Sequence, residues 1–139
     1  MDTKFSVAIH VLILISESPS PLNSEQMSES VGTNASYIRK VLALLKKAEL
    51  IDSYRGNGGY SLRIPSEHLT LFQIYQAVMQ EEKIHLLDIH QNANDQCIVG
   101  QHIRPVLSGM FDELEKSFAS ELEKRTLADC IAGIRNRME

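Results

Sequence analysis

Residues 34–64 read NASYIRKVLALLKKAELIDSYRGNGGYSLRI, and this stretch decides the fold. Its first half predicts a helix over residues 35–48, because Asn34 is a favourable N-cap and apolar side chains recur at helical spacing. Those apolar side chains are Ile38, Val41, Leu42 and Leu45. One face of the predicted helix is therefore apolar, and the rest presents basic and short polar groups.

The second half of the stretch predicts a β-hairpin. Residues 50–54 have extended character, and residues 60–64 alternate apolar and polar side chains as a half-buried strand does. Between them, RGNGG at residues 55–59 favours a turn, since glycine and asparagine tolerate positive φ. A helix is thus joined directly to a glycine-tipped hairpin.

Two further helical patterns precede this stretch. The first follows Asp2 or Thr3 and ends before Pro19. The second is capped by Asn23 or Ser24 and ends at Gly32. The order of helix, short helix, glycine-containing turn, helix and hairpin is typical of a winged helix-turn-helix, whose third helix enters the major groove of B-DNA.

Downstream of the hairpin, Thr70 caps a fourth helix. Residues 81–102 show no clear period, and we interpret them as a loop with one short helical turn at 84–89. A long helix over 103–124 follows, with Pro105 in its first turn. Thr126 then caps a last helix.

The predicted fold is therefore mainly α with a small β-hairpin. We expect a winged helix-turn-helix DNA-binding domain at residues 1–80, a sensor or linker loop at 81–102 and dimerisation helices at 103–139. The long helix carries an apolar stripe wide enough to form a dimer interface as well as a core. The stripe residues are Leu107, Met110, Phe111, Leu114, Phe118 and Leu122.

Charge is distributed unevenly along the chain. The net charge is −4, yet residues 34–63 hold six basic side chains against two acidic ones. A basic patch within an acidic protein is what a phosphate-binding surface requires. Charge alone does not separate that interpretation from a solvated helix face, and by itself favours the latter.

The winged-helix order assigns the candidate DNA-binding residues. Short polar groups and N–H groups at a helix start can meet phosphates or base edges, and a slim hairpin tip with one arginine can approach phosphates or a minor groove. The alternatives are that Tyr37 packs on the first helix and that Lys46 and Lys47 only complement the helix dipole. The candidate set is Lys4, Ser24, Asn34, Ser36, Tyr37, Arg39, Lys40, Arg55, Gly56, Asn57 and Gly58.

The chain also resembles a known family. Residues 35–42 (ASYIRKVL), 44–48 (LLKKA) and 55–62 (RGNGGYSL) resemble the Rrf2 family of bacterial winged-helix regulators, and TLAD at 126–129 is similar to the end of its dimer helix. The resemblance covers nearly the whole chain. It implies a homodimeric transcription factor, usually a repressor, whose long C-terminal helix crosses between subunits.

The same resemblance implies roles for individual residues. Ser36, Tyr37 and Arg39 would lie at the recognition-helix surface, and Arg55 would read or clamp DNA at the wing. A two-fold dimer of this kind predicts a palindromic operator on double-stranded DNA.

Some members of this family bind an iron–sulfur cluster through three cysteines before the long helix, whereas this chain has only Cys97 there. Thiolates are the usual cluster ligands, so one cysteine does not suffice even with His85, His90 or His102. Cys97 and His102 also do not match a closed zinc site. We therefore expect no cofactor and no metal.

Residues 94–100 (NDQCIVG) follow an N-x-x-C-x-V-G pattern and more closely resemble a single-cysteine branch of the family without a cluster. Two interpretations of Cys97 stay open. It is a redox or electrophile sensor, because a thiol near a helix start is more acidic and more reactive, or it is a structural thiol packed under the loop. We interpret Cys130 as a small core residue.

Composition argues against several other classes. The longest apolar run, Val7 to Ile15, is too short to span a membrane. No basic region precedes this run and no small-residue cleavage site follows it, so we do not expect a secretory signal. Two cysteines do not make a disulfide scaffold. These features predict a cytoplasmic protein without a membrane partner. No nucleophile–base pair or cofactor motif stands out, so we do not expect an enzyme.

The sequence thus predicts a homodimeric, sequence-specific DNA-binding transcriptional regulator. It is expected to act as a repressor and to respond to a redox signal or an unidentified ligand through the loop around Cys97. The alternative is a winged-helix adaptor that binds proteins and not DNA. The acidic net charge fits that alternative, whereas the placement of Arg39 with Arg55 does not.

Overall fold

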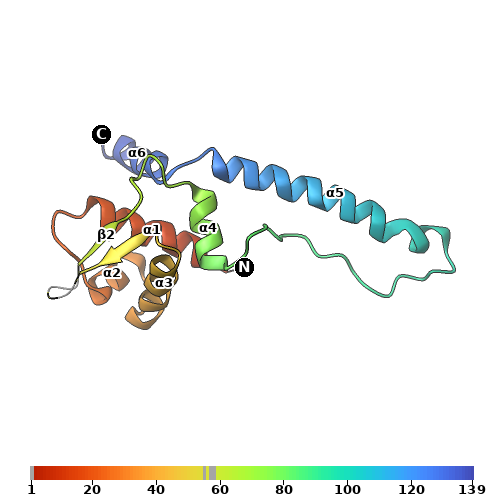
Figure 1. Ribbon diagram of the computed structural model, residues 1–139, viewed down its shortest axis with the longest axis horizontal. Coiled ribbons are helices and arrows are strands. Elements are labelled where there is room, and N and C mark those ends of the chain that lie inside the picture. Colours follow the sequence, from red (N-terminus) through yellow and green to blue (C-terminus); the bar gives the residue numbers. More distant parts are fainter. Residues whose placement is uncertain (1, 55, 57–58) are drawn as a thin grey trace.

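The computed structural model describes residues 2–54, 56 and 59–139. Most of the chain is helical, and two short strands form a hairpin, as predicted. The elements are α1 (Lys4–Glu17), α2 (Ser24–Val31), α3 (Ala35–Lys47), β1 (Ile51–Ser53), β2 (Tyr60–Leu62), α4 (Leu71–Met79), α5 (Ile98–Glu123) and α6 (Leu127–Met138). In Figure 1, α1 to α4 and the hairpin gather into one body, and α5 extends from it as a long arm.

The predicted helix caps in the helix-turn-helix are confirmed. Asn23 and Gln26 form a reciprocal capping box at the start of α2. Gly32 ends α2 with φ +84°, a left-handed conformation that glycine adopts without steric cost. At the start of α3, Asn34 Oδ1 accepts a hydrogen bond of 2.8 Å from the backbone N–H of Tyr37. Local sequence therefore fixes where α2 ends and α3 begins.

The wing is a two-stranded antiparallel hairpin, slightly shorter than predicted. Ile51 pairs with Leu62 and Ser53 with Tyr60, and the N–H of Tyr54 donates to the carbonyl of Gly59 at 2.9 Å. Ile51 is buried, so the hairpin is anchored on the core at its base.

One hydrophobic core joins the winged helix to α6. Fully buried side chains come from α1, α3, β1 and α4, and Leu127 and Ile131 of α6 lie in the same cluster. The backbone strengthens this junction, because the N–H of Leu127 donates to the carbonyl of Leu69 at 2.8 Å and the N–H of Leu71 to that of Arg125 at 2.9 Å. Thus α6 packs on the winged helix of its own chain.

The predicted start of the long helix at residue 103 is wrong. The helix begins at Ile98, with Cys97 as its N-cap, and Pro105 lies inside it and not in its first turn. An interior proline removes the hydrogen bond to the carbonyl four residues earlier. Gln101 and Pro105 are both exposed residues, so the proline interrupts the helix on a side that the chain's own core does not cover.

The predicted helical turn at 84–89 is also wrong, since that segment is not helical. It runs back along α5 in the opposite direction, because Lys83 lies 3.8 Å from Asp112 and Arg104 Nη2 lies 3.5 Å from the carbonyl of His90. Backbone N–H groups in this segment donate to a side chain of α5 and not to carbonyl oxygens of the segment itself, so no helical turn forms there. Figure 1 shows the segment following the arm to its tip.

The side chain that holds this segment is Glu115 of α5. The N–H groups of Leu86 and Leu87 both donate to its Oε2, the second at 3.0 Å. Glu115 is only 5% exposed. These two hydrogen bonds favour the charged carboxylate and lower the pKa of Glu115.

Within the described part of the chain, no helix has the length and apolar character needed to cross a membrane.

Candidate nucleic-acid interface

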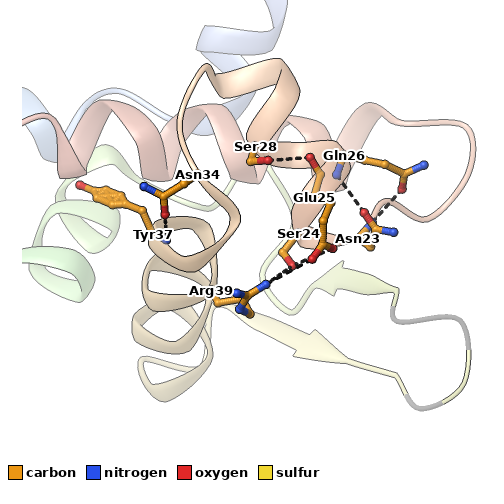
Figure 2. A network of polar contacts seen from close by, with 8 residues as sticks. All are labelled: Asn23, Ser24, Glu25, Gln26, Ser28, Asn34, Tyr37 and Arg39. Atoms are coloured by element: carbon orange, nitrogen blue, oxygen red, sulfur yellow. Dashed lines mark hydrogen bonds and ion pairs between the residues drawn. The ribbon is translucent and has the colours of Figure 1, made fainter.

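The N-termini of α2 and α3 lie on the exposed side of the helix-turn-helix. The first N–H groups of a helix have no partner within it and carry a partial positive charge, so they can donate to a DNA phosphate. Figure 2 shows the caps of both helices and the side chains between them. This face unites Ser24 of α2 with Arg39 of α3, both of which the sequence predicts to contact DNA.

Arg39 is the central cation of this face. Its Nη1 lies 3.2 Å from Ser24 Oγ and 3.4 Å from Glu25 Oε1. The Arg39 side chain is 57% exposed, so its guanidinium remains accessible to an incoming ligand. An exposed arginine on the third helix can form the paired hydrogen bonds that read guanine or grip a phosphate.

The remaining candidates on α3 surround an open hollow. Asn34, Ser36, Tyr37 and Lys40 line it, together with Thr3 and Thr33. Tyr37 is half-buried, packs against the core and also lines the hollow, so its packing does not remove it from this surface. The hollow is lined mainly by polar groups, as a surface for the sugar–phosphate backbone requires.

Lys4 stands at the start of α1, next to the hollow-lining Thr3. Its Nζ pairs with Asp2 at 3.7 Å, and about a third of the side chain is exposed. The structure therefore brings Lys4 to the edge of the same face rather than to its centre.

The wing candidates divide into two groups. Gly56 is exposed with φ +98°, a conformation that favours glycine. The predictions for Arg55, Asn57 and Gly58 fall outside the described residues.

Sequence reasoning missed two polar contacts that connect the interface. Lys46 Nζ donates to Ser53 Oγ at 2.8 Å and so links α3 to β1, in addition to complementing the helix C-terminus. The hydroxyl of Tyr54, a 58% exposed side chain, lies 2.9 Å from Ser61 Oγ on the opposite strand. Tyr54 directly precedes RGNGG at residues 55–59 in the sequence, and that position beside the predicted turn was the available signal.

Sequence reasoning also missed Glu25, the carboxylate beside Arg39. No linear pattern reveals this pair, because fourteen positions separate the two residues. Only the angle between α2 and α3 brings them together.

Cys97 lies at the other end of the molecule, at the tip of the arm. It is exposed, so the interpretation of a thiol packed under the loop is wrong for this chain. Hydrogen bonds from the N–H groups of Gly100 and Val99 lower the pKa of the Cys97 thiol.

The turn before Cys97 is tightly built. The N–H of Gln96 donates to Asn94 Oδ1 at 2.9 Å, and the N–H of Cys97 lies 3.2 Å from the carbonyl oxygen of Asn94. A Cβ at Gly100 would stand 1.9 Å from that oxygen, so glycine is required for this close approach. The contacts among Asn94, Gln96 and Gly100 thus fix the position of Cys97 at the start of α5.

The predicted dimer stripe divides along α5. Leu122 is buried, and Phe118 packs with Tyr75 of α4, with ring centroids 6.5 Å apart. Both therefore belong to the core of their own chain. Met110 and Leu114 are 56% and 57% exposed, and Leu107 and Phe111 are half-buried.

The sequence model of the Rrf2 family, described as an iron-dependent transcriptional regulator, matches residues 1–133. The described residues do not fit an iron–sulfur cluster or another metal site. No three of their His, Cys, Asp or Glu side chains come together where they could hold a metal ion. Cys97 and Cys130 stand before and after α5, whose 26 residues extend over about 39 Å.

Individual relatives agree with the family match. The chain is 34% identical over 129 residues to the "Putative HTH-type transcriptional regulator YwnA" of Bacillus subtilis (strain 168). This match covers 93% of this chain and 95% of that relative. A solved structure described as "a putative DNA binding protein" superposes with a TM-score of 0.73 at 30% identity, over 92% of this chain and 98% of the other.

A more distant structure, T. potens IscR, has a TM-score of 0.74 at 20% identity, over 100% of this chain and 90% of the other. It shows that the fold is shared. Together with the match over residues 1–133, these likenesses establish that the chain belongs to the Rrf2 family of winged helix-turn-helix transcriptional regulators.

Proposed function

We propose that the protein is a homodimer that binds a palindromic operator and represses transcription there. The observation that carries the proposal is the exposed Arg39 on α3, whose guanidinium contacts Ser24 in the first turn of α2. In this proposal residues 1–80 bind DNA, the 81–102 region carries the signal, and the exposed part of α5 within the 103–139 region pairs the subunits.

The exposed apolar side chains of α5 support the dimer. Val106, Met110 and Leu114 recur at intervals of four residues, and each is more than half exposed. Met110 lies at the middle of α5, so two antiparallel helices crossing near Met110 would bring Val106 of one protomer beside Leu114 of the other. Such a dimer presents two recognition helices related by two-fold symmetry, which requires a palindrome.

Cys97 supports a redox response. Its thiol is exposed and its pKa is lowered, so the thiolate that reacts with peroxide is favoured. A sulfenic acid at this N-cap would change the hydrogen bonds that begin α5, and with them the geometry of the dimer arm. The two recognition helices would then no longer match the operator spacing.

The test is operator selection from random duplexes with the full chain, performed reduced and after mild peroxide treatment. A palindrome recovered only from the reduced protein supports both DNA binding and the redox response, and Cys97→Ser should abolish the difference. The same palindrome from both samples rejects the redox response alone. Absence of enrichment in either sample rejects DNA binding and favours the protein adaptor.

A further inference from the structure

A carboxylate occupies the surface on which the proposed function requires DNA to dock. Glu25 stands in the first turn of α2, and its side chain is 66% exposed. Its Oε1 lies 3.4 Å from Arg39 Nη1, and its Oε2 lies 3.3 Å from Ser24 Oγ. Because Arg39 also contacts Ser24, these three side chains form a closed triangle between α2 and α3 (Figure 2).

This contact contributes little to folding, because exposed ion pairs are weak. Its effect on binding is larger. A negative side chain near the N-terminus of α2 repels the phosphate that this helix end would otherwise attract. It also pairs with Arg39, whose guanidinium contacts the first turn of that helix. Binding to a phosphate therefore requires Arg39 to leave Glu25 or Glu25 to lie beside the phosphate.

We propose that Glu25 is a specificity-determining residue of the DNA interface, a role that rests on the proposed function. It competes with phosphates for Arg39 and so suppresses binding to unrelated DNA. A duplex of unrelated sequence offers Arg39 mainly phosphates, which Glu25 opposes. On an operator the guanidinium binds a base edge instead, so no phosphate is needed beside Glu25 and only the weak exposed ion pair is lost.

The test compares the wild-type protein with Glu25→Gln on the selected operator and on a scrambled duplex of equal length, across a series of salt concentrations. We expect the affinity for the scrambled duplex to increase about three- to tenfold and the affinity for the operator to increase by less than about twofold. The salt dependence on the scrambled duplex should steepen by about one, because one more cation is free to contact a phosphate.

Glu29→Gln is the matched control. Glu29 lies one turn further along α2, is exposed, and makes no ion pair with any described residue. The Glu29→Gln substitution changes the net charge by the same amount as Glu25→Gln but does not release Arg39. Equal effects of the two variants would show a general charge effect and overturn the role of Glu25.

A double-mutant cycle tests the route through Arg39. In an Arg39→Ala background, Glu25→Gln should raise the affinity for the scrambled duplex by less than in the wild-type background, because the competition for Arg39 no longer exists and only the repulsion of phosphate remains. An equally large increase in both backgrounds would overturn the proposal. Glu25→Asp keeps the charge but shortens the side chain away from Arg39, so it should shift the scrambled-duplex affinity in the same direction as Glu25→Gln.

The outcomes separate this proposal from the proposed function. A wild-type protein that does not distinguish operator from scrambled duplex overturns the proposed function, and the role of Glu25 with it. If the wild-type protein does distinguish them and Glu25→Gln has the same ratio of operator affinity to scrambled-duplex affinity, only the role of Glu25 is overturned.

Discussion

Gly100 stands where the backbone leaves no room for a side chain. A Cβ there would meet the Asn94 carbonyl oxygen at 1.9 Å, so Gly100→Ala must displace the turn before α5. We expect a loss of about 1–3 kcal/mol in the free energy of unfolding, measured by thermal or urea denaturation.

Gly109→Ala is the matched control on the same helix. A Cβ at Gly109 meets nothing within 4 Å, and alanine favours a helix interior by about 1 kcal/mol. This variant should be as stable as the wild type or more stable. Equal stability of the Gly100 and Gly109 variants would contradict the close approach of Asn94.

The two thiols should differ in reactivity. Hydrogen bonds from backbone N–H groups lower the pKa of Cys97, whereas burial and the nearby Asp129 raise the pKa of Cys130. As pH rises, Cys97 therefore becomes a thiolate first. Alkylation by iodoacetamide, followed by mass spectrometry over a pH series, should modify Cys97 faster and with a lower midpoint. Faster labelling of Cys130 would disprove the assignment.

Helix-capping residues were predictable from the sequence, because they bind backbone groups only a few positions away. Asn34, Thr70 and Thr126 each cap the helix that follows, and each accepts the expected hydrogen bond from an N–H group three residues later. Glu25 was not predictable, because its partner Arg39 becomes a neighbour only through the packing of two helices.

Among the elements, α5 shows where local rules fail. Proline is favoured in the first turn of a helix, so Pro105 suggested a start near residue 103. The helix starts at Ile98, and its N-cap position is occupied by Cys97, a residue type outside the usual capping set. Ile98 and Val99 are 74% and 63% exposed, so burial on the chain's own core does not reveal this first turn.

The attachment of residues 85–87 to α5 should depend on pH. The pKa of Glu115 is lowered by two backbone hydrogen bonds, so the attachment is complete above the ordinary pKa of a glutamate. It is lost as pH falls through the lowered value, when the carboxylate is protonated. The amide resonances of Leu86 and Leu87, followed by NMR, should titrate together with a midpoint below that of ordinary glutamates.

Two variants test this attachment. Glu115→Gln removes the titrating charge, so the two amides should lose their pH-dependent shift and exchange faster with solvent at neutral pH. Glu113→Gln changes an exposed neighbour on the same helix and should leave both amides as in the wild type. An unchanged titration in Glu115→Gln would show that another group holds the segment.

At the scale of the whole molecule, the proposed dimer depends on the middle of α5. Met110→Glu would place a carboxylate near its symmetry mate on a surface that otherwise buries apolar side chains. We expect a weaker dimer by at least about tenfold in sedimentation velocity at micromolar concentration, with reduced operator binding. Met138→Glu, the same change at an 80% exposed position on α6, is the control. A monomeric wild-type protein would exclude the dimer.

Periodicity alone could not show which apolar side chains of α5 pack on their own chain and which are left for a second copy. Phe118 and Leu122 have the same spacing as Met110 and Leu114, yet they pack on α4 of their own chain. Helical spacing shows which side chains share a face, but it does not show whether that face meets the chain's own core or a second copy. Val106, which lies outside the predicted set, is exposed on the same helix.

The length of α5 has a consequence for how a signal would travel. Cys97 stands about 39 Å from Glu123, and so from the end of α5 that joins the winged helix of its own chain. If two such helices run antiparallel across Met110, each thiol comes beside the base of the other subunit's α5. Sensing would then operate in trans, because oxidation of Cys97 in one subunit would first disturb DNA binding by the partner subunit.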